Sequence, residues 1–141
     1  MLDQPIVLDI RCATCGATAM SIRTTEPGDA LWTSRRASGD EPPSTASAEG
    51  VEIEAGEHRL WLATGDLAGG TDAVRAAMLD GDVEVLLHLD DEIVPFYCRE
   101  CAASYCEAHW TTWSVFDPDW PSWFDELRGR CPVGHERRIY D

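Results

Sequence analysis

Residues 97–110 read YCRECAASYCEAHW and contain four potential metal ligands, Cys98, Cys101, Cys106 and His109. Two such ligands with two residues between them form a turn in which both side chains bind one metal ion. Only four residues separate Cys101 from Cys106. Two pairs that face the same ion need a longer return path between them. We therefore expect the two pairs in this stretch to bind different ions.

Two further pairs complete the candidate ligands. Cys12 and Cys15 lie near the start of the sequence, and Cys131 and His135 lie near its end. All six cysteines and two of the four histidines are then used, and eight ligands suffice for two tetrahedral sites. Thiolates mixed with imidazole favour Zn²⁺ over Mg²⁺ or Ca²⁺. The sequence therefore predicts two Zn²⁺ ions per chain and no other cofactor.

The short central spacer favours a cross-braced pairing, in which the first pair joins the third and the second joins the fourth. One site would then contain Cys12, Cys15, Cys106 and His109, and the other Cys98, Cys101, Cys131 and His135. Each site would have three thiolates and one imidazole. If the two histidines share an ion instead, one site is all thiolate. His58 and His88 remain alternative ligands.

The ligand pattern resembles that of the binuclear treble-clef zinc fingers, which include the RING and FYVE domains. The similar stretches are C-R-E-C-A-A-S-Y-C-E-A-H and the closing C-P-V-G-H-E-R-R, together with the Cys12/Cys15 pair. The 82 residues between Cys15 and Cys98 are far more than a RING loop usually has. The resemblance implies a cross-braced, RING-like treble-clef module. Local patterns add a β-rich insert with one helix, so we expect a small zinc-stabilised domain of the α+β class.

We expect three regions along the chain. Residues 1–24 contain an N-terminal strand and the first zinc-binding turn. Residues 25–96 form the insert, with a mobile loop at 35–50, short strands and a helix near 71–80. The loop is expected because 35–50 is rich in Pro, Ser, Gly and Ala and has almost no large apolar residue. Residues 97–141 form the binuclear module, which the Cys12/Cys15 pair completes.

The stretch that follows the expected helix is ambiguous. Val83, Val85 and Leu87 alternate with other residues as they would in a strand, but Leu86 interrupts the alternation. The sequence leaves the choice between strand and helix open here.

The charge of the chain limits its partners. Eleven arginines and no lysine stand against 26 acidic residues, which gives a formal net charge of −15. Binding to nucleic acid requires cations that neutralise phosphates, and an anionic membrane repels an acidic chain. We therefore expect neither nucleic acid nor a membrane as a partner. The sequence shows no apolar signal segment, so we expect a cytoplasmic protein, in which reduced cysteines bind metal rather than form disulfides.

The resemblance to RING domains also implies a function. In RING-type ligases, a conjugating enzyme docks in a groove beside the zinc loops. Trp113 or Trp120 would line this groove together with Pro132, and Arg137 would contact the activated modifier. We therefore expect a protein-interaction module, such as an adaptor of a ubiquitin-like modifier system. The alternative is a RING-type ligase that promotes transfer from a conjugating enzyme, again with no catalytic residue of its own.

Aromatic residues crowd the stretch HWTTWSVFDPDWPSWF at 109–124. These rings can pack around zinc loops that lack a core of their own. They can also form a binding surface for a partner, because tryptophan is enriched at the centres of protein interfaces. Asp117, Asp119 and Asp125 lie beside them, so the partner expected for such a surface is a basic, amphipathic peptide.

Overall fold

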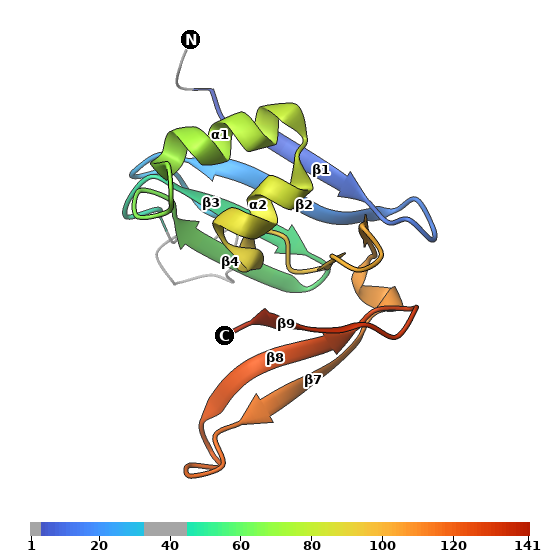
Figure 1. Cartoon of the computed structure of the whole chain (residues 1–141). Coiled ribbons are helices and arrows are strands. Elements are labelled where there is room, and N and C mark those ends of the chain that lie inside the picture. Colours follow the sequence, from blue (N-terminus) through green and yellow to red (C-terminus); the bar gives the residue numbers. More distant parts are fainter. Residues whose placement is uncertain (1–3, 33–44) are drawn as a thin grey trace, which may run out of the picture.

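The computed structural model describes residues 4–32 and 45–141. The first half of the chain forms a four-stranded antiparallel sheet in the order β1-β2-β3-β4. The bounds of these strands are β1 Val7–Arg11, β2 Thr18–Thr25, β3 Gly50–Ala55 and β4 His58–Ala63. The helices α1 (Gly70–Asp80) and α2 (Val83–Leu89) lie on one face of this sheet (Figure 1).

Short elements connect this first unit to a second, three-stranded sheet. They are the 3₁₀ helix η2 Asp91–Ile93, the paired strands β5 Tyr97–Cys98 and β6 Ala103–Ser104, and the 3₁₀ helix η3 Glu107–His109. The second sheet is antiparallel, in the order β7-β8-β9, with β7 Thr111–Phe116, β8 Phe124–Arg130 and β9 Glu136–Tyr140. The β7–β8 hairpin projects away from the rest of the molecule (Figure 1).

The main core lies between the four-stranded sheet and the helices. Strands β2 and β3 alternate in sequence, and their register pairs Ile22 with Ile53 and Thr24 with Val51 on one face. Burial of this face against apolar helix residues supplies the main driving force for folding of this unit. The fully buried side chains include Met20, Ile22, Val51, Ile53, Val74, Leu86, Ile93 and Phe96.

The fold class is α+β and mostly β, with two helices among the described residues rather than the one expected. The second helix, α2, occupies the stretch whose pattern was ambiguous. Leu86, which interrupts the strand-like alternation, is its fully buried residue, and the Asp82 side chain caps the helix by accepting a hydrogen bond from the Val85 amide. Helix α1 spans the segment where a helix is expected. Neither helix is long and apolar enough to cross a membrane.

The loop expected at 35–50 lies partly outside the described residues, which resume at Thr45. From there the chain is ordered by backbone contacts. Thr45 forms a β-bridge with Ala30, and the Ala46 amide donates to the carbonyl of Asp29 at 2.8 Å. Strand β3 then begins at Gly50. The last part of the expected mobile loop is therefore hydrogen-bonded to the segment after β2 and leads into β3.

A buried ion pair lies on the face of the sheet opposite the helices. Arg23 and Glu52 are paired across β2 and β3, with 2.7 Å between the Arg23 Nη2 and Glu52 Oε1 atoms. The same Glu52 oxygen accepts a hydrogen bond from the Trp32 amide at 2.6 Å, and the Arg23 guanidinium lies over the Trp32 ring. The Glu52 side chain is fully buried, so these partners take the place of solvating water.

Glu52→Ala should lower the free energy of unfolding by about 3–5 kcal/mol, because it leaves the Arg23 charge largely buried without its partner. Urea unfolding of the variant and the wild type measures this loss. The control is the double variant R23M/E52L, which replaces both charges by apolar side chains of similar size and should lose much less. Equal losses in the single and double variants would show that the charge pairing is not the cause.

Candidate metal centres

The first cluster joins the β1–β2 turn to the segment around η3. Its ligand atoms are those of Cys12, Cys15, Cys106 and His109, and all four lie within 4.8 Å of one another. The Nδ1 atom of His109 is 3.4 Å from the Cys12 sulfur and 3.1 Å from the Cys106 sulfur. The sulfurs of Cys15 and Cys106 are 3.7 Å apart. Cys12 is buried, whereas Cys15 is exposed.

The second cluster joins the turn after β5 to the turn between β8 and β9. It consists of Cys98, Cys101, Cys131 and His135, again within 4.8 Å of one another. The Nδ1 atom of His135 is 3.3–3.6 Å from all three sulfurs. The sulfurs of Cys101 and Cys131 are 3.9 Å apart. Cys98 and Cys131 are buried, so this cluster is more enclosed than the first.

These separations fit the edges of a coordination tetrahedron. Bond lengths of about 2.3 Å from zinc to sulfur and about 2.0 Å from zinc to nitrogen give edges of about 3.8 Å between sulfurs and about 3.5 Å between sulfur and nitrogen. The sulfur–sulfur distances of 3.7 and 3.9 Å match the first edge and are far longer than the ~2.05 Å of a disulfide. Both clusters can therefore hold a metal ion with protein ligands alone.

The four ligand pairs alternate between the clusters along the chain. The first and third pairs meet in one cluster, and the second and fourth meet in the other. These are the two sets of four residues that the short central spacer favours. His58 and His88 belong to neither cluster. A metal ion in the first cluster would link the four-stranded sheet to η3. A metal ion in the second cluster would link the β8–β9 turn to β5.

Tight backbone turns bring each pair of ligands together. In the first turn, the Gly16 amide donates to the Cys12 carbonyl at 2.9 Å, with Gly16 at a φ of 75°. In the last turn, the Gly134 amide donates to the Cys131 carbonyl at 3.0 Å, with Gly134 at a φ of 109°. Glycine suits both positions because a side chain disfavours positive φ. The three-residue spacing from Cys131 to His135 therefore fits a hairpin turn between two strands.

Backbone amides prepare one thiol in each cluster for metal binding. Burial opposes ionisation of Cys12, but the amides of Cys106, Cys15 and Thr14 outweigh it and lower the pKa of this thiol to about 6. Burial likewise opposes ionisation of Cys131, and the amides around its turn lower its pKa to about 6. Burial raises the pKa of Cys98 to about 12. Because thiolate is the ligand form, a bound metal must displace the remaining protons.

A polar contact at the first cluster was not apparent from the sequence. Glu107 lies between the ligands Cys106 and His109, and its carboxylate accepts a hydrogen bond from the Glu57 amide at 2.7 Å. The other carboxylate oxygen lies 3.3 Å from His58 Nε2, and His58 Nδ1 lies 3.0 Å from the Tyr140 hydroxyl. The β3–β4 turn, the third ligand pair and the end of β9 are therefore joined.

Gly56 is the residue that leaves room for this contact. A Cβ atom at position 56 would lie 1.8 Å from the Glu107 carboxylate, so only glycine allows so close an approach. Its φ of 60° would also strain any other residue. On the sequence alone, Gly56 indicates only a turn between two strands.

Of the residues expected at a RING-like partner groove, Trp120 and Pro132 lie at opposite ends of β8. Trp120 lies in the loop beyond Phe116 and Phe124, and Pro132 follows Arg130 at the other end of β8. Seven strand residues separate these ends by about 20 Å. Trp113 lies along β7 with the Arg130 guanidinium over its ring. Pro132 is exposed.

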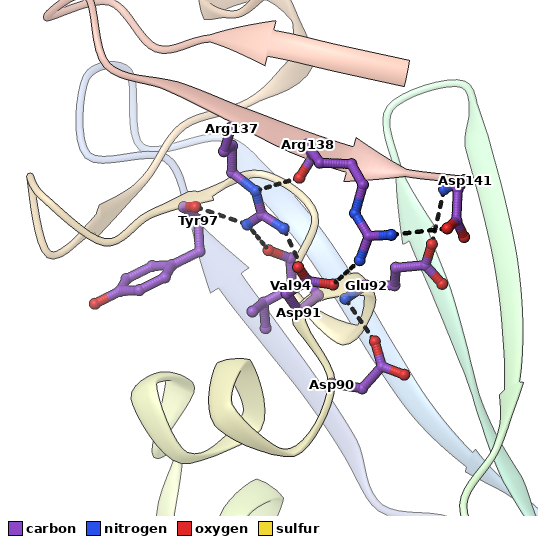
Figure 2. A network of polar contacts seen from close by, with 8 residues as sticks. All are labelled: Asp90, Asp91, Glu92, Val94, Tyr97, Arg137, Arg138 and Asp141. Carbon is purple, nitrogen blue, oxygen red and sulfur yellow. Dashed lines mark hydrogen bonds and ion pairs between the residues drawn. The ribbon is translucent and has the colours of Figure 1, made fainter. Parts of the chain in front are cut away.

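The Arg137 side chain, expected to contact a modifier, is hydrogen-bonded to backbone carbonyls of its own chain (Figure 2). Its guanidinium donates to the carbonyls of Asp91, Val94 and Tyr97 at 2.8–2.9 Å. Its Nε atom donates to the Arg138 carbonyl at 2.7 Å. A partner that contacted this guanidinium would compete with the four carbonyls, and the modifier contact that the RING resemblance implies stays a prediction.

Comparison with known proteins gives a match to a family model. A family model described as a domain of unknown function, DUF8328, matches residues 5–141. The matched region includes all eight residues of the two clusters. No curated protein and no solved structure gives a significant match.

Proposed function

This chain belongs to the DUF8328 family, and we propose that it is a zinc-stabilised protein-interaction module in which both metal ions are structural. The observation that carries this proposal is the pair of complete clusters, each with four protein ligands. A structural zinc site is closed by four protein ligands, whereas a catalytic site usually has three and leaves one position for water or substrate. The function of the metals is then to fix the arrangement of the loops and the second sheet.

The small size of the second sheet supports a structural role for the metals. Among its described residues, only Leu127, Gly129 and Ile139 are buried. The cluster with Cys131 and His135 lies in its β8–β9 turn, and β7 begins two residues after His109 of the first cluster. A sheet with so few buried side chains needs another source of stability, and metal binding can supply it.

The resemblance to RING domains extends the proposal to an adaptor of a ubiquitin-like modifier system. The alternating ligand pairs support this extension, as does the exposed Pro132 in the last ligand pair. The ligase alternative has less support, because Trp120 and Pro132 lie at opposite ends of β8 and Arg137 is held by backbone carbonyls. A cytoplasmic location would suit such a module, because thiols stay reduced there and can bind metal.

The purified protein should contain about two zinc ions per chain, because eight ligands form two closed sites. Removal of the metal should unfold the β7–β9 sheet, because ligand ordering and folding are coupled. Elemental analysis measures the metal content, and near-ultraviolet circular dichroism follows the tryptophan environment during chelation. Readdition of Zn²⁺ should restore the spectrum, and Mg²⁺ serves as the control that should not. A protein that keeps its native spectrum after verified loss of zinc would contradict the structural role.

A further inference from the structure

Four exposed aromatic side chains lie at the distal end of the β7–β8 hairpin. We call Phe116, Trp120, Trp123 and Phe124 the aromatic tip. Their exposed fractions are 51, 65, 68 and 46%, respectively. Trp110, in the same aromatic stretch, is only 6% exposed. The aromatic tip therefore holds the most exposed rings of this stretch.

The loop that carries the aromatic tip is ordered. The Asp117 amide donates to the Trp123 carbonyl at 2.9 Å, and the Trp123 amide donates to the Trp120 carbonyl at 2.8 Å. The Asp117 side chain also accepts from the amides of Asp119 and Trp120. Pro118 and Pro121 restrict the backbone further. Because the backbone of this loop is already held in place, binding a partner would cost little backbone entropy here.

The charge around the aromatic tip has one sign. Residues 114–127 contain Asp117, Asp119, Asp125 and Glu126 but no basic residue. Asp117 is engaged in the turn, and Glu126 pairs with Arg128 at 3.4 Å. Asp119 and Asp125 are exposed, and neither has an ion pair with any described residue. Two unpaired carboxylates therefore lie in sequence beside Trp120 and Phe124.

Building on the protein-interaction function, we propose that the aromatic tip binds a basic, amphipathic segment of a partner protein. Apolar side chains of that segment would cover the rings, as aromatic anchors do at the centres of protein interfaces. Its lysine or arginine side chains would pair with Asp119 and Asp125 and stack on the indole rings of Trp120 and Trp123. Electrostatic attraction to a chain of net charge −15 would also speed association with such a segment.

Charge disfavours two other occupants of this surface. A second copy of the chain would place the same acidic residues against each other, and like charges across an interface disfavour association. An anionic membrane would repel the same carboxylates. Apolar burial of the rings would favour a protein segment, a second copy and a membrane alike. The sign of the charge therefore distinguishes a basic protein segment from the other two.

A synthetic 18-residue helical peptide of leucine and lysine, with its leucines on one face, tests the proposal. Titration calorimetry should show binding to the zinc-loaded wild type. W120A/W123A should weaken binding about tenfold or more, because it removes two aromatic anchors. D119N/D125N should weaken it less and reduce its dependence on salt. Signals of the Trp120 and Trp123 indole protons should shift when the peptide binds.

Matched controls separate this surface from general attraction to an acidic protein. Leu79→Ala removes a side chain that is 72% exposed on α1, and Asp66→Asn removes an exposed carboxylate elsewhere. Both control variants should bind the peptide as the wild type does. A peptide with glutamate in place of lysine should not bind. Equal binding by the wild type and W120A/W123A would overturn the proposal.

Two further measurements test the other occupants. Analytical ultracentrifugation that shows a dimer disrupted by W120A/W123A would assign the surface to a second copy and overturn the proposal. Cosedimentation with phosphatidylserine vesicles that depends on the same residues would assign it to a membrane, with the same consequence. Zinc content and thermal unfolding are recorded for each variant. A protein with two structural zincs that binds no peptide would defeat this proposal and leave the structural role of the metals intact.

Discussion

Cys131→Ser should leave about one zinc ion per chain and unfold the β7–β9 sheet. Cys131 is buried in the more enclosed cluster, between strands β8 and β9, and its thiol has a pKa lowered to about 6. Its loss leaves three ligands, two of which lie in a different segment at 98–101. Structural zinc contributes about 10–16 kcal/mol to the folding of zinc-finger peptides. That contribution is comparable to the total stability of a typical domain, about 5–15 kcal/mol.

Elemental analysis and amide hydrogen exchange measure this effect. We expect protection to be lost in β8 and β9 and largely retained in β2 and β3, which lie in the main core. Val133→Ser is the matched control, because Val133 lies in the same turn, is 66% exposed and is not a ligand. Two zinc ions and native protection of β8 in the Cys131 variant would refute the role of this cluster.

The assignment of ligands to clusters could be reasoned from the sequence because it depends on short-range geometry. A spacer of four residues between Cys101 and Cys106 is too short for both central ligand pairs to face the same ion. The structure brings the pairs together in the corresponding sets. The α+β class followed from local patterns in the same way. The treble-clef fold itself stays a prediction, because the short 3₁₀ and β elements around the clusters do not establish it.

The roles of the aromatic residues could not be assigned from the sequence. Trp110 and Trp120 belong to one aromatic stretch. The Trp110 ring stacks on the Phe96 ring, with 5.8 Å between the ring centroids, and its Nε1 atom donates to the Tyr105 carbonyl at 3.0 Å. Trp120 lies beyond the end of β7 in an exposed loop. Trp110 is buried because it lies just before β7, where the β7–β8 hairpin joins the rest of the molecule, whereas Trp120 lies at the other end of that hairpin. Phe96 lies 14 positions before Trp110, and no local pattern indicates that their rings meet.

Arg137 links two ligand pairs of the second cluster through the backbone. It follows His135 by two residues, and it donates to the Tyr97 carbonyl directly before Cys98. Its other partners, the carbonyls of Asp91 and Val94, belong to η2 and the residue after it (Figure 2). Val94 is fully buried and Tyr97 is 5% exposed, so their carbonyls have little access to water in place of the guanidinium. The sequence could not reveal this role, because its basis is a set of backbone carbonyls about 40 residues away.

Arg137→Met should therefore lower the free energy of unfolding by about 3–5 kcal/mol, because three carbonyls lose a charged donor and a hydrogen bond to a charged group contributes about 1.5–3 kcal/mol. Urea unfolding of the zinc-loaded protein measures the loss, and competition with a chelator should show weaker metal binding at the second cluster. Arg138→Met is the matched control. Arg138 pairs with Asp91 and Asp141 through a partly exposed side chain, and such pairs contribute about 0–1 kcal/mol. Similar losses in the two variants would mean that the carbonyls near Cys98 find other donors, and that the metal alone holds the two ligand pairs together.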